Sequence, residues 1–188
     1  TKNRKQLGTA RGVACLVVTV TNDAVSALCA GSIADTLKRL KTDGVFASKQ
    51  GAWFSYLTPE GPYRAVAFHG LGDVGTPVNA VAIRRGGGTA AAELSKLRID
   101  SLILDMAGDA WPVDAFLEGV VLGQYRFDLH KTVAPDDEPV AVQDVTLVSN
   151  AKTISAVSDR CRDAVQICEY ANWARDLANE SPNHMTPS

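Results

Sequence analysis

The amino-acid sequence predicts an α/β fold, a three-layer domain in which a mixed or parallel sheet is covered by helices on both faces. Short runs of β-branched and apolar residues alternate with longer segments whose apolar residues recur at helical spacing, which is the pattern of helices packed on such a sheet. The chain has 188 residues, of which 46% are hydrophobic and 21% charged. This length and composition suit one globular domain with one core.

The first third of the chain predicts three strands and a helix. Val13–Val20 is rich in β-branched residues and has the length of an interior strand. Ser32–Leu40 carries apolar residues at helical spacing, and a basic turn with Gly44 ends that helix. Trp53–Leu57 and Tyr63–Phe68 are predicted as the two strands of a hairpin, because the residues between them, Thr-Pro-Glu-Gly-Pro, favour a turn.

The middle of the chain continues the alternation. Pro77–Leu97 is predicted to be a helix, although three consecutive glycines begin at Gly86 inside it. Three glycines cost about 3 kcal/mol of helix propensity relative to alanine, so either the helix breaks there or a neighbouring backbone needs to approach closely. Ile99–Leu104 and Val140–Val148 are predicted as strands, with a helix over Trp111–Tyr125 between them.

The last predicted helix covers Thr153–Ala178 and would be about 39 Å long if all of it is helical. Its apolar residues form one stripe with alternating steps of three and four. The stripe consists of Ile154, Val157, Cys161, Ala164, Val165, Cys168 and Ala171. A polar strip with two prolines follows, up to Ser188.

Charge and composition exclude several classes of partner. The formal net charge is −2, so no general attraction to nucleic acid or to an anionic membrane is expected. No apolar run approaches the roughly 20 residues needed to cross a bilayer, and the basic start is not followed directly by an apolar segment of signal-peptide type. The four cysteines lie at no metal-binding spacing and are expected to be buried free thiols. We therefore expect a cytoplasmic protein.

One glycine-rich motif is typical of nucleotide-binding loops. Gly70-Leu-Gly72-Asp-Val-Gly75 matches G-x-G-x-x-G between a predicted strand and a predicted helix, where glycine amides would bind a pyrophosphate. However, the strand is not the first of the chain, Asp73 puts negative charge in the loop, and Asp105 lies about 30 residues beyond it instead of about 20. The alternative is a tight glycine turn, and we expect no cofactor site here.

Other residues capable of chemistry are few. The three histidines, His69, His130 and His184, are far apart in sequence and form no metal-binding pair. His69 is the only one placed near a possible pocket, and a structural role is the simpler reading. The acidic run from Asp136 to Glu138 lies between two prolines and is expected to be solvated surface. The sequence therefore predicts no catalytic and no metal-binding residue in this chain.

Two segments and a short run resemble one enzyme family. Residues Ala174–Asn183, with the pattern A-R-D-L-x-N-x-x-x-N and a following Thr-Pro, resemble the stretch that leads into the catalytic domain of leucyl (cytosol) aminopeptidases. Phe116–Lys131 is similar to the family pattern E-G-x-x-L-G-x-Y-x-F-x-x-Y-K, with His130 in place of the second tyrosine. The matching residues are Glu118, Gly119, Leu122, Gly123, Tyr125, Phe127 and Lys131. His69–Gly72 is similar to the family's V-G-L-G.

The resemblance implies a macro-domain-like N-terminal domain over residues 1–150, with a linking helix and the start of a connection over residues 151–188. In this family the catalytic domain binds two divalent ions, zinc or manganese, and releases N-terminal amino acids from peptides. The signature N-T-D-A-E-G-R that binds these metals is absent from this sequence. The implied role is to cap the protein's own catalytic domain and to support assembly into a hexamer, and the chain alone is expected to be inactive.

Two other classes remain open. A free-standing macro-like module would bind ADP-ribose or a related nucleotide through Gly70–Gly75 or Gly86–Gly88. A nucleotide-dependent oxidoreductase would use the first of these loops. The coding sequence beyond Ser188, together with calorimetry against ADP-ribose, separates these alternatives from the peptidase reading.

Overall fold

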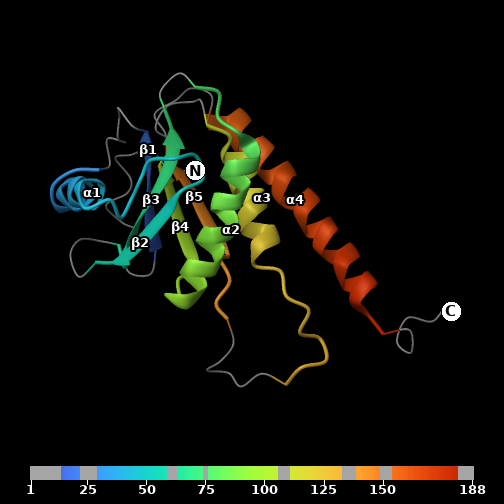
Figure 1. Ribbon diagram of the computed structural model, residues 1–188. Helices are drawn as coiled ribbons and strands as arrows, with labels where there is room; N and C mark the ends of the chain where they lie inside the picture. Colours follow the sequence, from blue (N-terminus) through green and yellow to red (C-terminus); the bar gives the residue numbers. More distant parts are fainter. Residues whose placement is uncertain are drawn as a thin grey trace.

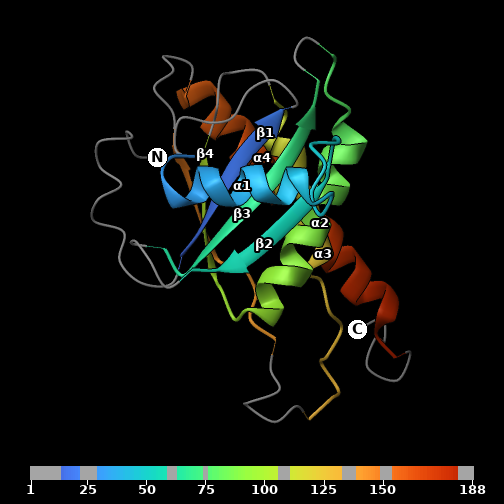
Figure 2. The same ribbon diagram turned by 60° about the vertical axis from the view of Figure 1, so that its left-hand side comes forward.

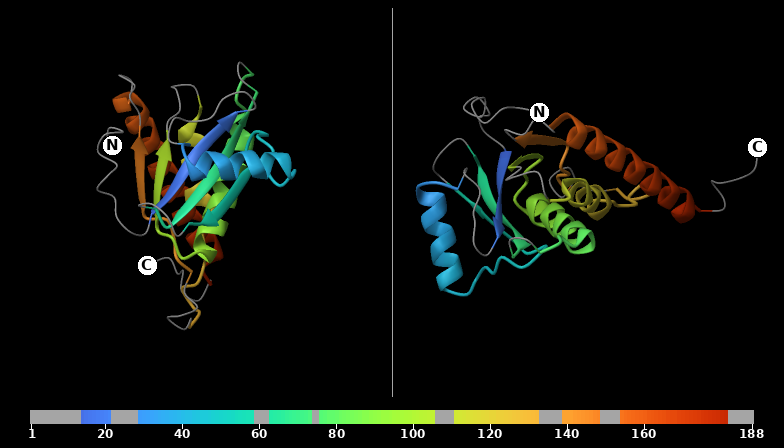
Figure 3. Two further views of the ribbon diagram at one scale, coloured as in Figure 1. Left: turned by 90° about the vertical axis from the view of Figure 1, so that its left-hand side faces the viewer. Right: turned by 90° about the horizontal axis from the view of Figure 1, so that it is seen from above.

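The computed structural model describes residues 14–21, 29–58, 63–73, 76–105, 111–132, 139–148 and 154–181. These residues form a five-stranded mixed sheet with helices on both faces (Figure 1). Helix α1 (Ser32–Thr42) covers one face, and the turned view shows it lying across the strands (Figure 2). Helices α2 (Ala80–Lys96) and α3 (Val113–Gly123) cover the other face, with α4 (Ile154–Asn179) along α3 (Figure 3). The predicted three-layer α/β fold is confirmed.

The sheet has the strand order β2-β3-β1-β4-β5. Its strands are β1 (Ala14–Thr21), β2 (Trp53–Leu57), β3 (Ala65–Gly72), β4 (Ser101–Asp105) and β5 (Asp144–Val148). β1 pairs in parallel with β3 and β4, β4 pairs in parallel with β5, and only β2 runs antiparallel to its neighbour β3. Because β1 is central, it is apolar on both faces. The predicted hairpin is confirmed by the pairing of β2 with β3.

Two strands differ by four residues at one end from their predicted bounds. β3 continues through Gly72 instead of ending at Phe68, because Gly70 and Gly72 still pair with Val20 and Thr21 of β1 across an irregularity in the register. β5 begins at Asp144 instead of Val140. Just before it, Val142 bonds through both its N–H and its carbonyl oxygen to the side chain of Gln124, the residue after α3, so this segment is held without a strand partner.

The remaining helices are α2 (Ala80–Lys96), α3 (Val113–Gly123) and α4 (Ile154–Asn179). Helix α2 is capped by Asn79, whose side chain accepts hydrogen bonds from the N–H groups of Val81 and Ala82. It passes through the three glycines without a break. Of the two predicted outcomes, close backbone approach is therefore the one observed.

The glycines bring α2 and α3 together. A Cβ at Gly87 would overlap the Phe116 carbonyl oxygen, and a Cβ at Gly119 would overlap the Arg84 carbonyl oxygen. Gly123 of α3 faces Gly88, and a Cβ added at Gly123 would meet the Gly88 Cα at 2.8 Å. Glycine lowers the helix propensity of α2, but it allows the backbones of α2 and α3 to pack in direct contact.

Two apolar cores lie on the two faces of the sheet. One, centred on Phe68, Val18 and Leu37, packs the sheet against α1. The larger one joins the sheet to α2, α3 and the first half of α4, and it includes Val157 and Cys161. The predicted stripe of α4 is buried at Val157, Cys161, Ala164 and Cys168, half-buried at Ile154 and Val165, and exposed at Ala171.

All four cysteines are free, and Cys15, Cys161 and Cys168 are buried as predicted, whereas Cys29 is half-buried. Burial raises the pKa of Cys15 to about 12 and that of Cys161 to about 11. These thiols are therefore protonated at neutral pH and pack as small apolar groups.

In the part of the chain that the structure describes, no helix is both long and apolar enough to span a bilayer.

Candidate functional site

The predicted glycine motif lies at the end of β3. The N–H of Gly70 donates to the Ala52 carbonyl oxygen at 2.9 Å, and the N–H of Gly72 donates to that of Ser48 at 2.7 Å. A Cβ at Gly70 would overlap the Lys49 carbonyl oxygen, and Gly72 has a φ of 83°. These contacts account for both glycines without a ligand, because the amides that would bind a phosphate are already used. Gly75 lies outside the described residues.

His69 lies in the core among aromatic rings. Its ring centroid is 4.9 Å from that of Phe116, 5.6 Å from that of Trp111 and 6.2 Å from that of Trp53. Gly86 of α2 makes room for it, since a Cβ there would meet His69 Cε1 at 2.7 Å. No ring nitrogen of His69 has a hydrogen-bond partner of standard geometry among the described residues. Burial lowers its pKa to about 4, with a smaller opposite effect from the Ala52 backbone.

Among the residues that the structure describes, the others that could carry chemistry are not gathered into a site. His130 lies on the surface after α3, far along the chain from His69, and it pairs with Glu180. His184 and the acidic run from Asp136 to Glu138 lie outside the described residues. Among the residues that are described, no three histidine, cysteine or acidic side chains come together as a metal site. The donor set needed for two divalent ions is therefore not assembled there.

The two segments that carry the family resemblance meet in space. The Arg175 guanidinium carbon lies 4.3 Å from the centre of the Tyr125 ring, and Asn179 Nδ2 donates to the Tyr125 hydroxyl at 3.1 Å. Arg175 also donates to the Leu122 carbonyl oxygen at 3.4 Å, and Asn172 to that of Val121 at 3.2 Å. These carbonyls lie in the last turn of α3, which has no further intrahelical donors for them.

We call this contact region the latch; it consists of Val121, Leu122, Tyr125, His130, Asn172, Arg175, Asn179 and Glu180. His130, which stands where the family pattern has tyrosine, places Nε2 2.7 Å from Glu180 Oε1. Lys131, another match to the pattern, bonds Asp128 at 3.0 Å, and Arg126 bonds the same carboxylate at 2.6 Å. These two cations hold the pKa of Asp128 below its usual range. The motif residues thus fix the chain after α3 and attach it to α4.

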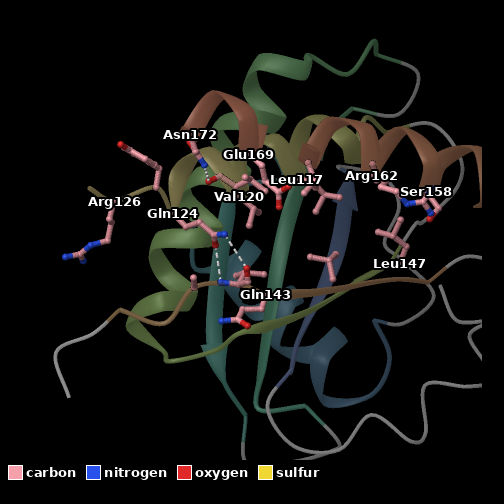
Figure 4. A pocket seen from close by; sticks show the side chains of 17 residues that line it. Leu117, Val120, Gln124, Arg126, Gln143, Leu147, Ser158, Arg162, Glu169 and Asn172 are labelled. Carbon is pink, nitrogen blue, oxygen red and sulfur yellow. Dashed lines mark hydrogen bonds between the residues drawn. The ribbon is translucent and has the colours of Figure 1, made fainter. Parts of the chain in front are cut away.

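Beside the latch, α3, α4 and β5 enclose an open groove of about 690 Å³. Leu117 and Val120 line its middle, Leu147 lies near Arg162 at one end, and Arg126 lies at the other end (Figure 4). Its cysteine, Cys161, has a raised pKa and no histidine beside it in the lining. The lining supplies no nucleophile with a base.

Sequence reasoning found the motif segments but not their contact. Tyr125 and Arg175 are 50 positions apart, and no periodicity connects them. A weak sequence signal for this contact exists, since polar residues at positions 172, 175 and 179 recur at helical spacing. They continue the face of α4 that is apolar and buried from Val157 to Cys168.

Comparison with known proteins gives a consistent result. Residues 17–133 match the family model described as "Cytosol aminopeptidase family, N-terminal domain". The chain is 29% identical over 180 residues to a probable cytosol aminopeptidase of Rhizobium etli (strain CIAT 652), covering 94% of this chain and 36% of the relative. It is 32% identical over 152 residues to that of Rhizobium meliloti (strain 1021), covering 77% of this chain and 30% of the relative. The chain spans about a third of the length of these relatives.

Solved structures show the same fold. A mutant of tomato leucine aminopeptidase superposes with a TM-score of 0.67 at 15% identity, covering 95% of this chain and 38% of that chain. The bottromycin maturation enzyme BotP superposes with a TM-score of 0.63 at 20% identity, covering 94% and 35%. A second structure of BotP, in complex with Mn, gives a TM-score of 0.62. The fold described above is thus similar to a part of each of these larger proteins.

Proposed function

Because the chain belongs to the cytosol aminopeptidase family, we propose that it is the non-catalytic N-terminal domain of a dinuclear-metal leucyl aminopeptidase. The observation that carries the proposal is the agreement of two independent features. The family model matches an N-terminal domain, and the matching relatives are about three times as long as the aligned stretch. The peptidase chemistry then belongs to the remaining part of the polypeptide.

The proposed division of the chain follows its packing. Residues 1–150 would form the macro-like domain, and residues 151–188 the linking helix with the start of the connection. In support, the first half of α4 is part of the larger core and its second half extends past the sheet (Figure 3). The latch holds this second half in one orientation.

We propose that the metals of the parent protein, two zinc or manganese ions, are held entirely outside this chain. No described residues form a suitable donor set, so no step of peptide hydrolysis is assigned to them. The metals would polarise the scissile carbonyl and supply a bound hydroxide when present. This chain would cap the catalytic domain that holds the metal centre. It would also support assembly into a hexamer. The names of the relatives support a cytoplasmic location.

The test compares the peptidase activity of the 188-residue chain with that of a longer protein from the same gene. A protein expressed from the gene with its coding sequence extended beyond codon 188 should hydrolyse a leucyl anilide in the presence of Mn²⁺. The 188-residue chain should not, at any Mn²⁺ concentration. Hydrolysis by the 188-residue chain would contradict the assignment of the chemistry to the other part. A stop codon directly after Ser188, with tight ADP-ribose binding by calorimetry, would instead favour the nucleotide-binding module.

A further inference from the structure

The inward face of α4 changes character along its length. From Val157 to Cys168 the residues that face α3 are apolar and buried. From position 172 onward the same face carries Asn172, Arg175 and Asn179, which bond the end of α3 and Tyr125. The second half of the helix therefore contacts its own domain through polar groups.

The outward face of the second half is apolar. Four large side chains there are exposed, Ile167 by 67%, Tyr170 by 62%, Trp173 by 61% and Leu177 by 41%. We call these four residues the outer stripe. At about 100° per residue they fall within an arc of about 120°, on the side of the helix away from Val157 and Cys168. The charged residues of this stretch, Glu169, Arg175 and Asp176, fall outside the arc.

An exposed stripe of this kind is unusual. Single exposed apolar residues are normal on protein surfaces, but contiguous ones mark interaction sites. An ordinary surface helix has apolar residues on its inward face and polar residues on its outward face. The second half of α4 has the opposite arrangement. Within the described domain the Tyr170 hydroxyl accepts a hydrogen bond from Gln166 of the same helix, but most of the Trp173 and Tyr170 side chains stays in contact with water. A partner surface that removes them from water would gain from both.

The size of the stripe indicates which partner it fits. Four side chains of this kind present on the order of 400 Å² of apolar surface, about half of the roughly 800 Å² per partner in a stable interface. Such a patch is too small to hold a second copy by itself. It is sufficient for a domain attached to the same chain, because a short connection supplies an effective concentration in the millimolar range.

We propose that the outer stripe is the surface on which the catalytic domain of the same polypeptide docks, through an apolar groove of that domain. The spacing of Tyr170, Trp173 and Leu177 is that of a helix seated in such a groove. The inference rests on the proposed function, since it needs the polypeptide to continue beyond α4. Beyond the proposed function, it names the residues of α4 that would contact the catalytic domain.

The test is the reactivity of a thiol placed on the stripe. Tyr170→Cys is compared with Val81→Cys, which lies on α2 and is 52% exposed in the wild type, and both are made in the 188-residue chain and in the extended protein. The native thiols give a slow background, because three of them are buried. Maleimide labelling at position 170 should be at least tenfold slower in the extended protein than in the 188-residue chain. Labelling at position 81 should be equal in the two.

A second substitution tests the contact from the other side. In the extended Tyr170→Cys protein, Trp173→Glu should restore fast labelling at position 170. Val45→Glu, at a site 58% exposed on a different surface, should leave it slow. Circular dichroism identifies a variant that fails to fold, and the labelling of Tyr170→Cys alone then decides the test.

Each other outcome contradicts the inference. Equal labelling of position 170 in both polypeptides, with the extended protein an active peptidase, would overturn the docking surface while the proposed function stands. Protection in the 188-residue chain that increases with its concentration would assign the stripe to a second copy. Protection there at all concentrations would mean that the chain covers its own stripe. An extended protein without peptidase activity would contradict the proposed function itself.

Discussion

His69 is a fully buried titratable side chain with aromatic neighbours on three sides and a glycine on the fourth. No charged group is among these ring and glycine contacts. The neutral imidazole packs there as a ring, whereas an imidazolium would lose its hydration without gaining a counter-ion. This is the physical reason why burial lowers its pKa to about 4.

The stability of the domain should therefore depend on pH through this residue. At pH above 6.5, His69 is neutral in both the folded and the unfolded state and contributes no pH dependence. As the pH falls from 6.5 to about 4, the unfolded state binds a proton that the folded state does not, so the free energy of unfolding decreases. The full decrease is about 3 kcal/mol for a shift of this size.

Urea unfolding of the wild type and of His69→Leu, measured between pH 7.5 and 4.5, checks this prediction. The replacement lowers stability at all pH values through altered packing, but the difference between the two proteins should shrink as the pH falls. Parallel curves would show that the buried imidazole is not the titrating group.

At the scale of elements, the contact between α2 and α3 depends on particular glycines. Gly87→Ala should destabilise the domain by about 2 kcal/mol, because its Cβ would overlap the Phe116 carbonyl oxygen of α3. Gly88→Ala should stabilise it by up to about 1 kcal/mol, because the nearest atom to its Cβ is the Gly119 carbonyl oxygen at 3.7 Å and the gain in helix propensity remains. Thermal unfolding of the two variants should shift in opposite directions. A shift of both in the same direction would contradict the described packing.

The latch gives a second prediction at this scale. Arg175→Ala removes the contact with the Tyr125 ring and the bond to Leu122, which are two of the contacts that attach this part of α4 to the end of α3. Hydrogen exchange in the last two turns of α4 should become about fivefold faster, with little change in the first half. Arg162→Ala is the matched control, since Arg162 pairs with Asp159 of its own helix. Equal exchange in both variants would mean that the latch does not hold the helix.

The elements themselves could be predicted from the sequence because their signals are local. Spacing alone located β2 without error and α4 to within one residue at each end. The end of β3 could not be found in this way, because Gly70 and Gly72 are read as a turn unless the pairing with β1 is known. The glycines of α2 posed the same difficulty, since a Cβ at Gly86 would meet His69 of β3 and a Cβ at Gly87 would meet Phe116 of α3, both far away in sequence.

The candidate site was predictable only in part. Two motif segments pointed to the family, yet their meeting through Tyr125 and Arg175 required the fold. The outer stripe was hidden for a different reason. In the sequence, Ile167 and Tyr170 lie among the positions of the predicted stripe and Trp173 follows it closely. A helix with apolar residues on two faces shows no single direction until its packing is known.

At the scale of the whole molecule, α4 belongs to two structures at once. Its first half completes the larger core through Val157 and Cys161, and its second half carries the outer stripe. Because both halves are one continuous helix held by the latch, the direction of the stripe is fixed relative to the sheet. A domain docked on it would have a defined orientation rather than a flexible attachment.

Shortened chains test this double role. A chain ending at residue 150 loses the four buried side chains of α4, whose burial contributes about 5 kcal/mol, comparable with the total stability of a typical domain. It should show no cooperative thermal transition. A chain ending at residue 169 keeps all four and loses only the latch and most of the stripe, so its transition should lie within a few degrees of the intact chain. If instead the chain ending at residue 150 unfolds cooperatively near the same temperature, the helix is a tether attached to a complete domain, and the orientation of whatever follows it is not set by the core.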